Sequence, residues 1–316
     1  MALSILFNLF QVIFVIAFAP LVEGIASKLK ENLQSKRGPN IFQPYRDLWK
    51  LLHKDEIVSE HSSWIFRAAP YVAFAAPVFV ALLIPVLTSY PLFFAFMGDM
   101  LGGGFVLALG GFFGTLAAVD TANPYGPMGA SRTRMVGFLA EPVFIIVFLT
   151  VSFVAGSTIP YIVQQRWVTP IANFFEPSHV LLMIAFLMLI LAEDGRIPVD
   201  SPSGLFELAM IDRSKSLEYS GRGAALMKWA GAMKFLTLIC IFLNVLVTPW
   251  GLAGGKSATD VLIAIPLVLV KIFGFVLVLV YIESSLAKLR LFRITEFLGA
   301  AFVISVVAMI TRLSEI

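Results

Sequence analysis

Eight long apolar stretches constrain the fold of this chain more than any other feature of its sequence. A helix needs about 20 mostly apolar residues to cross about 30 Å of hydrocarbon. Hydrophobic residues make up 59% of the 316 residues and charged residues only 14%, far from the balance of a soluble protein. We therefore predict an all-α integral membrane protein with about eight transmembrane helices in a single domain, 1–316. The spans are expected at roughly 3 to 27, 70 to 89, 99 to 119, 136 to 157, 177 to 193, 224 to 249, 259 to 283 and 295 to 313.

The loops between these spans differ sharply in their content of basic residues. The first, third, fifth and seventh loops hold most of the lysines and arginines. The second loop has none, and the fourth and sixth have only Arg166 and Lys256. Because basic residues are retained on the cytoplasmic side of a membrane, the sequence predicts that the odd-numbered loops are cytoplasmic and that both termini face outward.

The first loop contains an amphipathic segment, IFQPYRDLWKLLHKDEIV, at 41–58. Within it Tyr45, Leu48, Trp49 and Leu52 recur at the spacing of one helical face, while charged side chains occupy the other faces. This pattern is typical of a helix that lies in the membrane interface. We predict an interfacial helix in this cytoplasmic loop; the alternative is a solvated connector.

The loop between the fifth and sixth spans, 192–222, carries six carboxylates and is named here the acidic loop. Its acids lie where the chain leaves and re-enters the bilayer, a position where charge is costly and usually functional. Prolines on both sides of Asp200 restrict the backbone around it. The alternative is that the six acids form an ordinary solvated face. They are Glu193, Asp194, Asp200, Glu207, Asp212 and Glu218.

Charged residues also lie within or at the edges of the spans. A carboxyl or amino group in a low-dielectric environment can have its pKa moved toward neutrality, so each such residue is a candidate for a proton path. We expect Lys271 near the middle of the seventh span and Glu141 a turn or two inside the fourth. For Glu23 and Glu283, a role as interface anchor or salt-bridge partner is an equal alternative. The candidates are Glu23, Glu141, Glu193, Lys234, Lys271 and Glu283.

Other kinds of chemistry have little support in the sequence. A single cysteine, Cys240, can hold neither a disulfide nor an iron–sulfur cluster, and no two of the three histidines have the i, i+4 spacing of a helical metal site. We therefore predict no metal and no cofactor in this chain. The net charge of +3 is small and argues against nucleic acid. Because no nucleophile with its base and no phosphate-binding loop is present, catalysis by this chain alone is not expected.

Five segments, taken together with the eight spans, resemble one family. They occur in the family's order and, with the spans, cover most of the chain. The chain is similar to the membrane subunit shared by respiratory complex I (subunit 1, beside the quinone cavity) and the membrane-bound group 4 [NiFe] hydrogenases, including formate hydrogenlyase. The segments are SKRGPNIFQPYRDLWKLLHKDE at 35–56, DTANPYGPMGASRTRM at 120–135, AEDGRIPVDSP at 192–202, FEL at 206–208 and LEYSGRGAALMKWA at 217–230.

Details within these segments favour the hydrogenase branch of the family. The quinone-reducing branch has a run like PEAESEL after the proline, whereas this chain has Pro202-Ser203-Gly204-Leu205-Phe206-Glu207-Leu208 and so lacks two acids, at 203 and 205. The first-loop run RGPNIFQPYRDLWKLL and the MKWA segment also look like the hydrogenase branch.

The resemblance implies roles for particular residues. Glu141, Glu193 and Lys234 would connect a cytoplasmic cavity to the membrane interior, although the missing acids put the full glutamate path of the family in doubt. The residues that would line or brace that cavity, under the nearest iron–sulfur cluster of a partner, are Arg37, Asp47, Lys50, Arg132, Arg196, Asp200, Glu207 and Glu218.

The resemblance also implies a function and partners. We expect a membrane-anchoring and coupling subunit in the inner (cytoplasmic) membrane of a prokaryotic cell, linking electron transfer to proton or sodium translocation. The [NiFe] centre would reside in a hydrogenase-like large subunit and the iron–sulfur clusters in a small subunit, with antiporter-like subunits beside the chain in the bilayer. The alternatives are a quinone-site subunit of a complex I-type enzyme, an independent secondary transporter and a passive anchor.

Overall fold

The computed structural model describes residues 2–90, 93–94, 98–121, 123–168, 176–200, 211, 213–255 and 257–314. The regular secondary structure within these residues is helical, apart from one isolated bridge between Thr88 and Ala253. The helices are α1 (Ala2–Leu33), α2 (Gln43–Leu52), α3 (Trp64–Leu83), α4 (Met100–Val119), α5 (Tyr125–Ala155), α6 (Pro160–Val168), α7 (Pro177–Glu193), α8 (Gly221–Ile241), α9 (Ala258–Ser285) and α10 (Leu291–Ser314), with a 3-10 turn at Arg213–Ser216 and a π-helical turn at Phe242–Val247.

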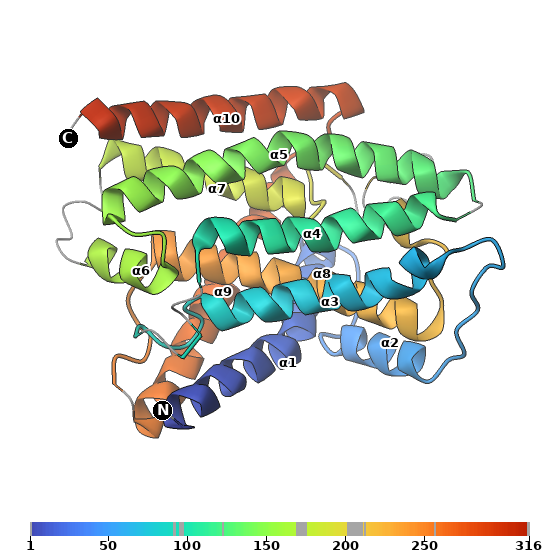
Figure 1. Ribbon diagram of the computed structural model, residues 1–316, viewed down its shortest axis with the longest axis horizontal. Helices are drawn as coiled ribbons and strands as arrows, with labels where there is room; N and C mark the ends of the chain where they lie inside the picture. Colours follow the sequence, from blue (N-terminus) through green and yellow to red (C-terminus); the bar gives the residue numbers. More distant parts are fainter. Residues whose placement is uncertain are drawn as a thin grey trace.

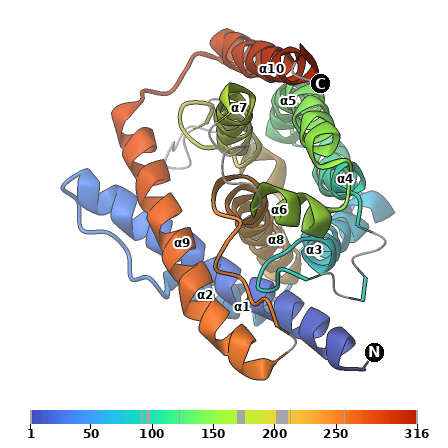
Figure 2. The same cartoon turned by 90° about the vertical axis from the view of Figure 1, so that its left-hand side faces the viewer.

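The helices form a bundle around α8, which lies at the centre when the molecule is viewed from the end that holds the termini (Figure 2). In the most apolar part of the helix that begins at Gly221, 83% of the residues are buried, whereas only 28% are buried in that of α10. α8 is therefore central and α10 peripheral. α3 packs on α4 and α8, α10 packs on α5 and α7, and α1 crosses both α8 and α9. Both termini lie at one end of the bundle, and α2 lies toward the opposite end (Figure 1).

The predicted fold class is confirmed. Seven of the described helices are long and apolar enough to span a membrane, and α7, with 17 residues, is a shorter apolar helix that matches the fifth predicted span. Each of the eight predicted stretches thus contains an apolar helix, but the ends of the helices differ from the prediction. α5 begins at Tyr125, ahead of the expected 136, and Glu141 consequently lies near the middle of that helix rather than close to its start.

The second span ends earlier than predicted because of Pro85. α3 stops at Leu83, and Ile84 is extended, as is usual for a residue that precedes proline. The backbone that leaves the helix finds its partners in buried side chains. Gln11 donates to the carbonyls of Ala81 and Ile84 at 2.8 Å each, and Asn244 donates to that of Pro85 at 2.9 Å. Buried non-helical backbone is tolerated in a membrane protein only when it is paired in this way.

Two short helices lie outside the spans. α6 was not expected from the sequence, and it lies at the end that holds the termini (Figure 1). α2 forms within the predicted amphipathic segment, and Leu48 on its apolar face is buried. Trp49, which was assigned to the same face, is instead 66% exposed. The i, i+3, i+4 pattern thus located the helix, but it did not show which of the apolar residues pack against the bundle.

The close approach of α1 to the segment before α2 gives a first prediction. A Cβ on Gly24 would lie 2.1 Å from the carbonyl oxygen of Ile41, which is backbone and cannot move away cheaply. The substitution Gly24→Ala is expected to destabilise the protein by about 1–3 kcal/mol, as overpacking does. Thermal unfolding of the purified protein in detergent measures the change. Gly137→Ala is the matched control, because nothing lies within 4 Å of its Cβ position; a similar loss in both variants would contradict the assigned contact.

Candidate functional site

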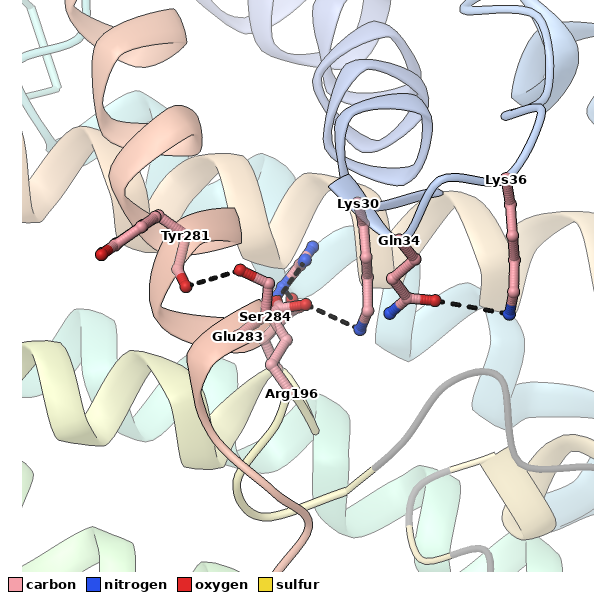
Figure 3. Close-up of polar contacts among 8 residues, drawn as sticks. Lys30, Gln34, Lys36, Arg196, Tyr281, Glu283 and Ser284 are labelled. Carbon is pink, nitrogen blue, oxygen red and sulfur yellow. Dashed lines mark hydrogen bonds and ion pairs between the residues drawn. The ribbon is translucent and has the colours of Figure 1, made fainter. Parts of the chain in front are cut away.

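Glu283, near the end of α9, joins three segments that are far apart in the sequence. Its side chain is completely buried and accepts from Lys30 Nζ at 2.7 Å and from an Arg196 guanidinium nitrogen at 3.0 Å. Figure 3 shows Glu283 between Lys30 of α1 and Arg196 of the acidic loop. Arg196 also pairs with Asp194. We name these four residues, Lys30, Glu283, Arg196 and Asp194, the ionic cluster; when all are ionised, their charges sum to zero.

Arg196 is the centre of the ionic cluster. Its guanidinium carbon lies 3.9 Å from the centroid of the Phe235 ring on α8, so one cation is held by two carboxylates and an aromatic face. The two carboxylates raise the pKa of Arg196, although burial acts in the opposite direction. Burial raises the pKa of Asp194 to about 6, and the attraction of Arg196 offsets this only in part. Asp194 is therefore a group of the acidic loop that titrates close to neutral pH.

A second group of charged residues, each partly exposed, lies around a cavity between α4, α5, α8 and the end of α7. Lys234 of α8 donates to the Glu193 carboxylate at 2.5 Å and to the Glu193 carbonyl at 3.0 Å. Glu141 of α5 lines the same cavity and lies 4.0 Å from Arg134, one of its neighbours on the same helix. The structure thus brings together three residues predicted to form the path: Glu141, Glu193 and Lys234.

Asp200 joins the acidic loop to the segment that follows α9. It is 3% exposed; one carboxylate oxygen accepts from Lys288 at 2.8 Å and the other from the backbone N–H of Ile211 at 3.0 Å. A buried carboxylate is stable when paired and hydrogen-bonded in this manner. Lys288 was not singled out from the sequence, because it lies 88 residues away from Asp200.

Two further predicted residues hold loops and helices together at the start of α8. Glu218 accepts from Asn123 in the α4–α5 loop, and the next residue, Tyr219, stacks on Phe66 with ring centroids 4.1 Å apart. Asp47 on α2 accepts from Lys228 on α8 at 2.9 Å. The pKa of Asp47 is lowered: burial acts to raise it, but the hydrogen bond and charge of Lys228 outweigh burial. These contacts show bracing between elements.

Four other predicted residues that the structure describes, Lys271, Arg37, Lys50 and Arg132, do not line this cavity. Lys271 donates to the backbone carbonyl of Thr248 at 2.7 Å and to that of Trp250, after the π-helical turn, so it is not beside Glu141 or Glu193. Arg37 and Lys50 are exposed, and Arg132 is half-buried on α5. Glu207 lies outside the described residues. Among the residues that are described, no three His, Cys, Asp or Glu side chains come together in an arrangement that could hold a metal ion.

The sequence did not predict that the four residues of the ionic cluster contact one another. Arg196 was predicted to line a cavity, and Glu283 was given salt-bridge pairing as one alternative, which the structure confirms. Lys30 was counted only among the basic residues of the first loop. The available signal was the presence of both signs of charge at the predicted cytoplasmic ends of three spans, but sequence alone does not show which ends meet.

The fold and the site define a multi-pass membrane protein in which ion pairs are buried between and beneath the spans. A family model described as NADH dehydrogenase matches residues 6–313, and the chain therefore belongs to this family. It is 32% identical over 314 residues to formate hydrogenlyase subunit 4 of Escherichia coli (strain K12), which covers 99% of this chain and 100% of that protein. It is 30% identical to hydrogenase-4 component C of the same organism, over 96% and 94% of the two chains.

Similarity to quinone-linked proteins is weaker and shorter. A relative from Rickettsia peacockii (strain Rustic), named as a subunit of NADH-quinone oxidoreductase, is 27% identical over 205 residues, which is 61% of this chain and 58% of that protein.

A chain in the structure of the membrane-bound sulfane sulfur reductase, an archaeal respiratory membrane complex, has the same fold, with a TM-score of 0.79. It is 19% identical and covers 98% of this chain and 99% of that one. These likenesses confirm the resemblance to the shared membrane subunit.

The ionic cluster gives a prediction about stability. Replacing Glu283 by Ala leaves Lys30 and Arg196 buried without the carboxylate that pairs them, and such losses cost about 3–5 kcal/mol. Thermal unfolding in detergent should show a large destabilisation. The exposed acid Glu60, replaced by Ala, is the control and should change stability by less than about 0.5 kcal/mol. Equal stability of the two variants would show that Glu283 does not hold the three segments together.

Asp194 gives a prediction about titration. Because burial raises its pKa to about 6, the carboxyl should be protonated below that pH and ionised above it. Infrared difference spectra should show a protonated-carboxyl band that disappears with a midpoint near pH 6. The band should be missing in Asp194→Asn. A band that persists unchanged in this variant belongs to a different carboxyl.

Proposed function

We propose that the chain is the membrane-anchoring and coupling subunit of a multisubunit energy-converting [NiFe] hydrogenase. In this function, electron transfer in a cytoplasmic redox arm drives proton or sodium translocation through the membrane. The observation that carries the proposal is the juxtaposition of Glu193 and Asp194 at the end of α7. Asp194 belongs to the ionic cluster, and Glu193 reaches into the cavity with Lys234 and Glu141.

This juxtaposition supports coupling because a change of charge at the ionic cluster is close enough to act electrostatically on the residues of the cavity. A charge that changes about 10 Å away in an effective dielectric near 20 is worth roughly 1.7 kcal/mol, enough to bias a protonation equilibrium by about one pKa unit. An electron that arrives on a cluster above the acidic loop therefore acts on Asp194 and Arg196 first. Through adjacent residues in the chain, the change reaches Glu193 and the Glu193–Lys234 pair.

The relatives support the hydrogenase branch rather than the quinone branch. The two relatives that match over nearly their full length are named as subunits of formate hydrogenlyase and hydrogenase-4. On this proposal the partners are a [NiFe] large subunit, an iron–sulfur small subunit and antiporter-like membrane subunits, and the clusters and the [NiFe] centre belong to the partners. The location is the cytoplasmic membrane of a prokaryote, with both termini outside and α2 and the acidic loop at the cytoplasmic face.

The proposal predicts that Glu193→Gln separates hydrogen formation from ion movement. The amide keeps the size of the side chain but removes the charge that pairs with Lys234. In inside-out vesicles holding the whole complex, hydrogen formation with reduced methyl viologen should continue, while ion uptake falls by about tenfold or more. Both quantities are measured on the same vesicles, with hydrogen by gas electrode and uptake by a pH-sensitive dye or by sodium-22.

Glu60→Gln is the control for this experiment, because Glu60 is an exposed acid away from the cavity. Wild-type ion uptake per hydrogen formed in Glu193→Gln would refute coupling through this residue. The subunits that copurify with the chain in mild detergent decide between the two branches of the family. A [NiFe] subunit supports the proposal, whereas a quinone module that reduces quinone would support the quinone-site alternative instead.

A further inference from the structure

Two cavities lie end to end along α4, and Gly104 lines both of them. The first is the cavity lined by Glu141, Glu193 and Lys234. The second lies between α3, α4 and α5 and reaches Asp99 and Pro160. The linings of the two cavities together extend from the partly exposed Glu193–Lys234 pair to the start of α4. The first has room for a few water molecules and the second for about one.

The junction between the two cavities is occupied by an aromatic ring. A Cβ on Gly104 would lie 1.8 Å from a ring atom of Phe144, so the ring of Phe144 rests directly on the backbone of α4. Phe144 packs edge-on against Phe148, with centroids 4.3 Å apart, and Phe148 lines the second cavity. A ring that turns about its side-chain torsions opens or closes such a junction without any movement of the helices. Only glycine at 104 leaves room for this ring.

Asp99 stands at the far end of the second cavity. It is half-buried and caps α4, accepting from the backbone N–H of Leu101 at 3.1 Å. The neighbouring Met100 N–H donates to the carbonyl of Thr158, just before α6, at 3.1 Å. This places Asp99 at the start of α4, at the end of the bundle where α6 and both termini lie (Figure 1). Asp99 is the acidic residue among those that line the second cavity.

We propose that the two cavities form an outlet for protons within this chain, running from the Glu193–Lys234 pair to Asp99 with Phe144 as its gate. The inference rests on the proposed function, that the chain takes part in ion translocation. A proton leaves the ammonium of Lys234 or the protonated carboxyl of Glu141 for a water molecule of the first cavity. It passes Phe144 as an excess proton on water, binds the Asp99 carboxylate and leaves to the outer solution. Each group regains its starting protonation state when the next proton arrives from the acidic loop.

The lining of the second cavity favours a proton over a metal cation. A sodium ion must replace its hydration shell with several oxygen ligands. The described lining of this cavity is apolar apart from Asp99 and backbone, and it has room for about one water. A proton needs only a hydrogen-bonded water, for which the cavity has room, and an acceptor, which Asp99 supplies. The apolar wall around the junction also holds back water when the ring of Phe144 is in place.

The first test uses Asp99→Asn in the whole complex, assayed in inside-out vesicles with reduced methyl viologen. Asparagine still caps α4, so the fold is retained while the proton acceptor is lost. Protons moved per hydrogen formed should fall by about tenfold or more, since loss of a positioned proton acceptor slows a transfer step by about 10². Asp260→Asn, an acid in the first turn of α9, is the control and should behave as the wild type.

The second test addresses the gate from both directions. Gly104→Ala displaces the Phe144 ring and should lower proton uptake, whereas Gly111→Ala on the same helix, with nothing within 4 Å of its Cβ, should not. Phe144→Ala removes the ring and should raise the passive proton leak of resting vesicles under a valinomycin-imposed potential several-fold. Partner subunits that copurify with each variant report on assembly.

The outcomes separate the inference from the proposed function. If Glu193→Gln uncouples the complex while Asp99→Asn, Gly104→Ala and Phe144→Ala behave as the wild type, the proposed function stands and the outlet within this chain is overturned. If Glu193→Gln itself stays coupled, the proposed function fails. Reduced uptake in Asp99→Asn together with a raised leak in Phe144→Ala supports the outlet.

Discussion

The pairing of Glu283 with two cations is the interaction on which the arrangement of α1, α9 and the acidic loop depends. A fully buried carboxylate would be very costly on its own, and so would a buried lysine or guanidinium. Together they hold α1, the end of α9 and the acidic loop at one point. Asp194 and Phe235 then fix the guanidinium of Arg196 against the end of α7 and the face of α8. The position of Glu193, and hence its access to Lys234, follows from this arrangement.

Hydropathy was sufficient to predict the spans because each helix in lipid must satisfy its own backbone and carry about 20 apolar residues. It was insufficient at helix ends. Pro85 lies inside the apolar run from 70 to 89, so the run continued although the helix stopped at Leu83. The signal was present, since a residue before proline avoids the helical region. Tyr125 begins α5 well before the apolar run, because polar residues extend that helix beyond the bilayer-length segment.

The site was predictable in part. Glu141, Glu193 and Lys234 could be named because charge within an apolar span is rare and costly, and the structure brings them to one cavity. The partnership of Lys30 with Glu283 joins residues 253 positions apart, and no periodicity in the sequence relates them. Lys271 was assigned to the same path by its depth in the chain, yet it lies against the backbone after the π-helical turn. Depth along a span does not show which way a side chain points.

An acidic residue lies near the start of α8, and a basic side chain lies near its end. Glu218 lies three residues before Gly221 at the start of the helix, and the ammonium of Lys271 binds carbonyls just beyond its π-helical turn. The aligned peptide dipoles of a helix are equivalent to about half a positive charge at its start and half a negative charge at its end. Both ends of this central macrodipole are therefore countered locally. The macrodipole of the central helix therefore favours the positions of both charges, which come from two different parts of the chain.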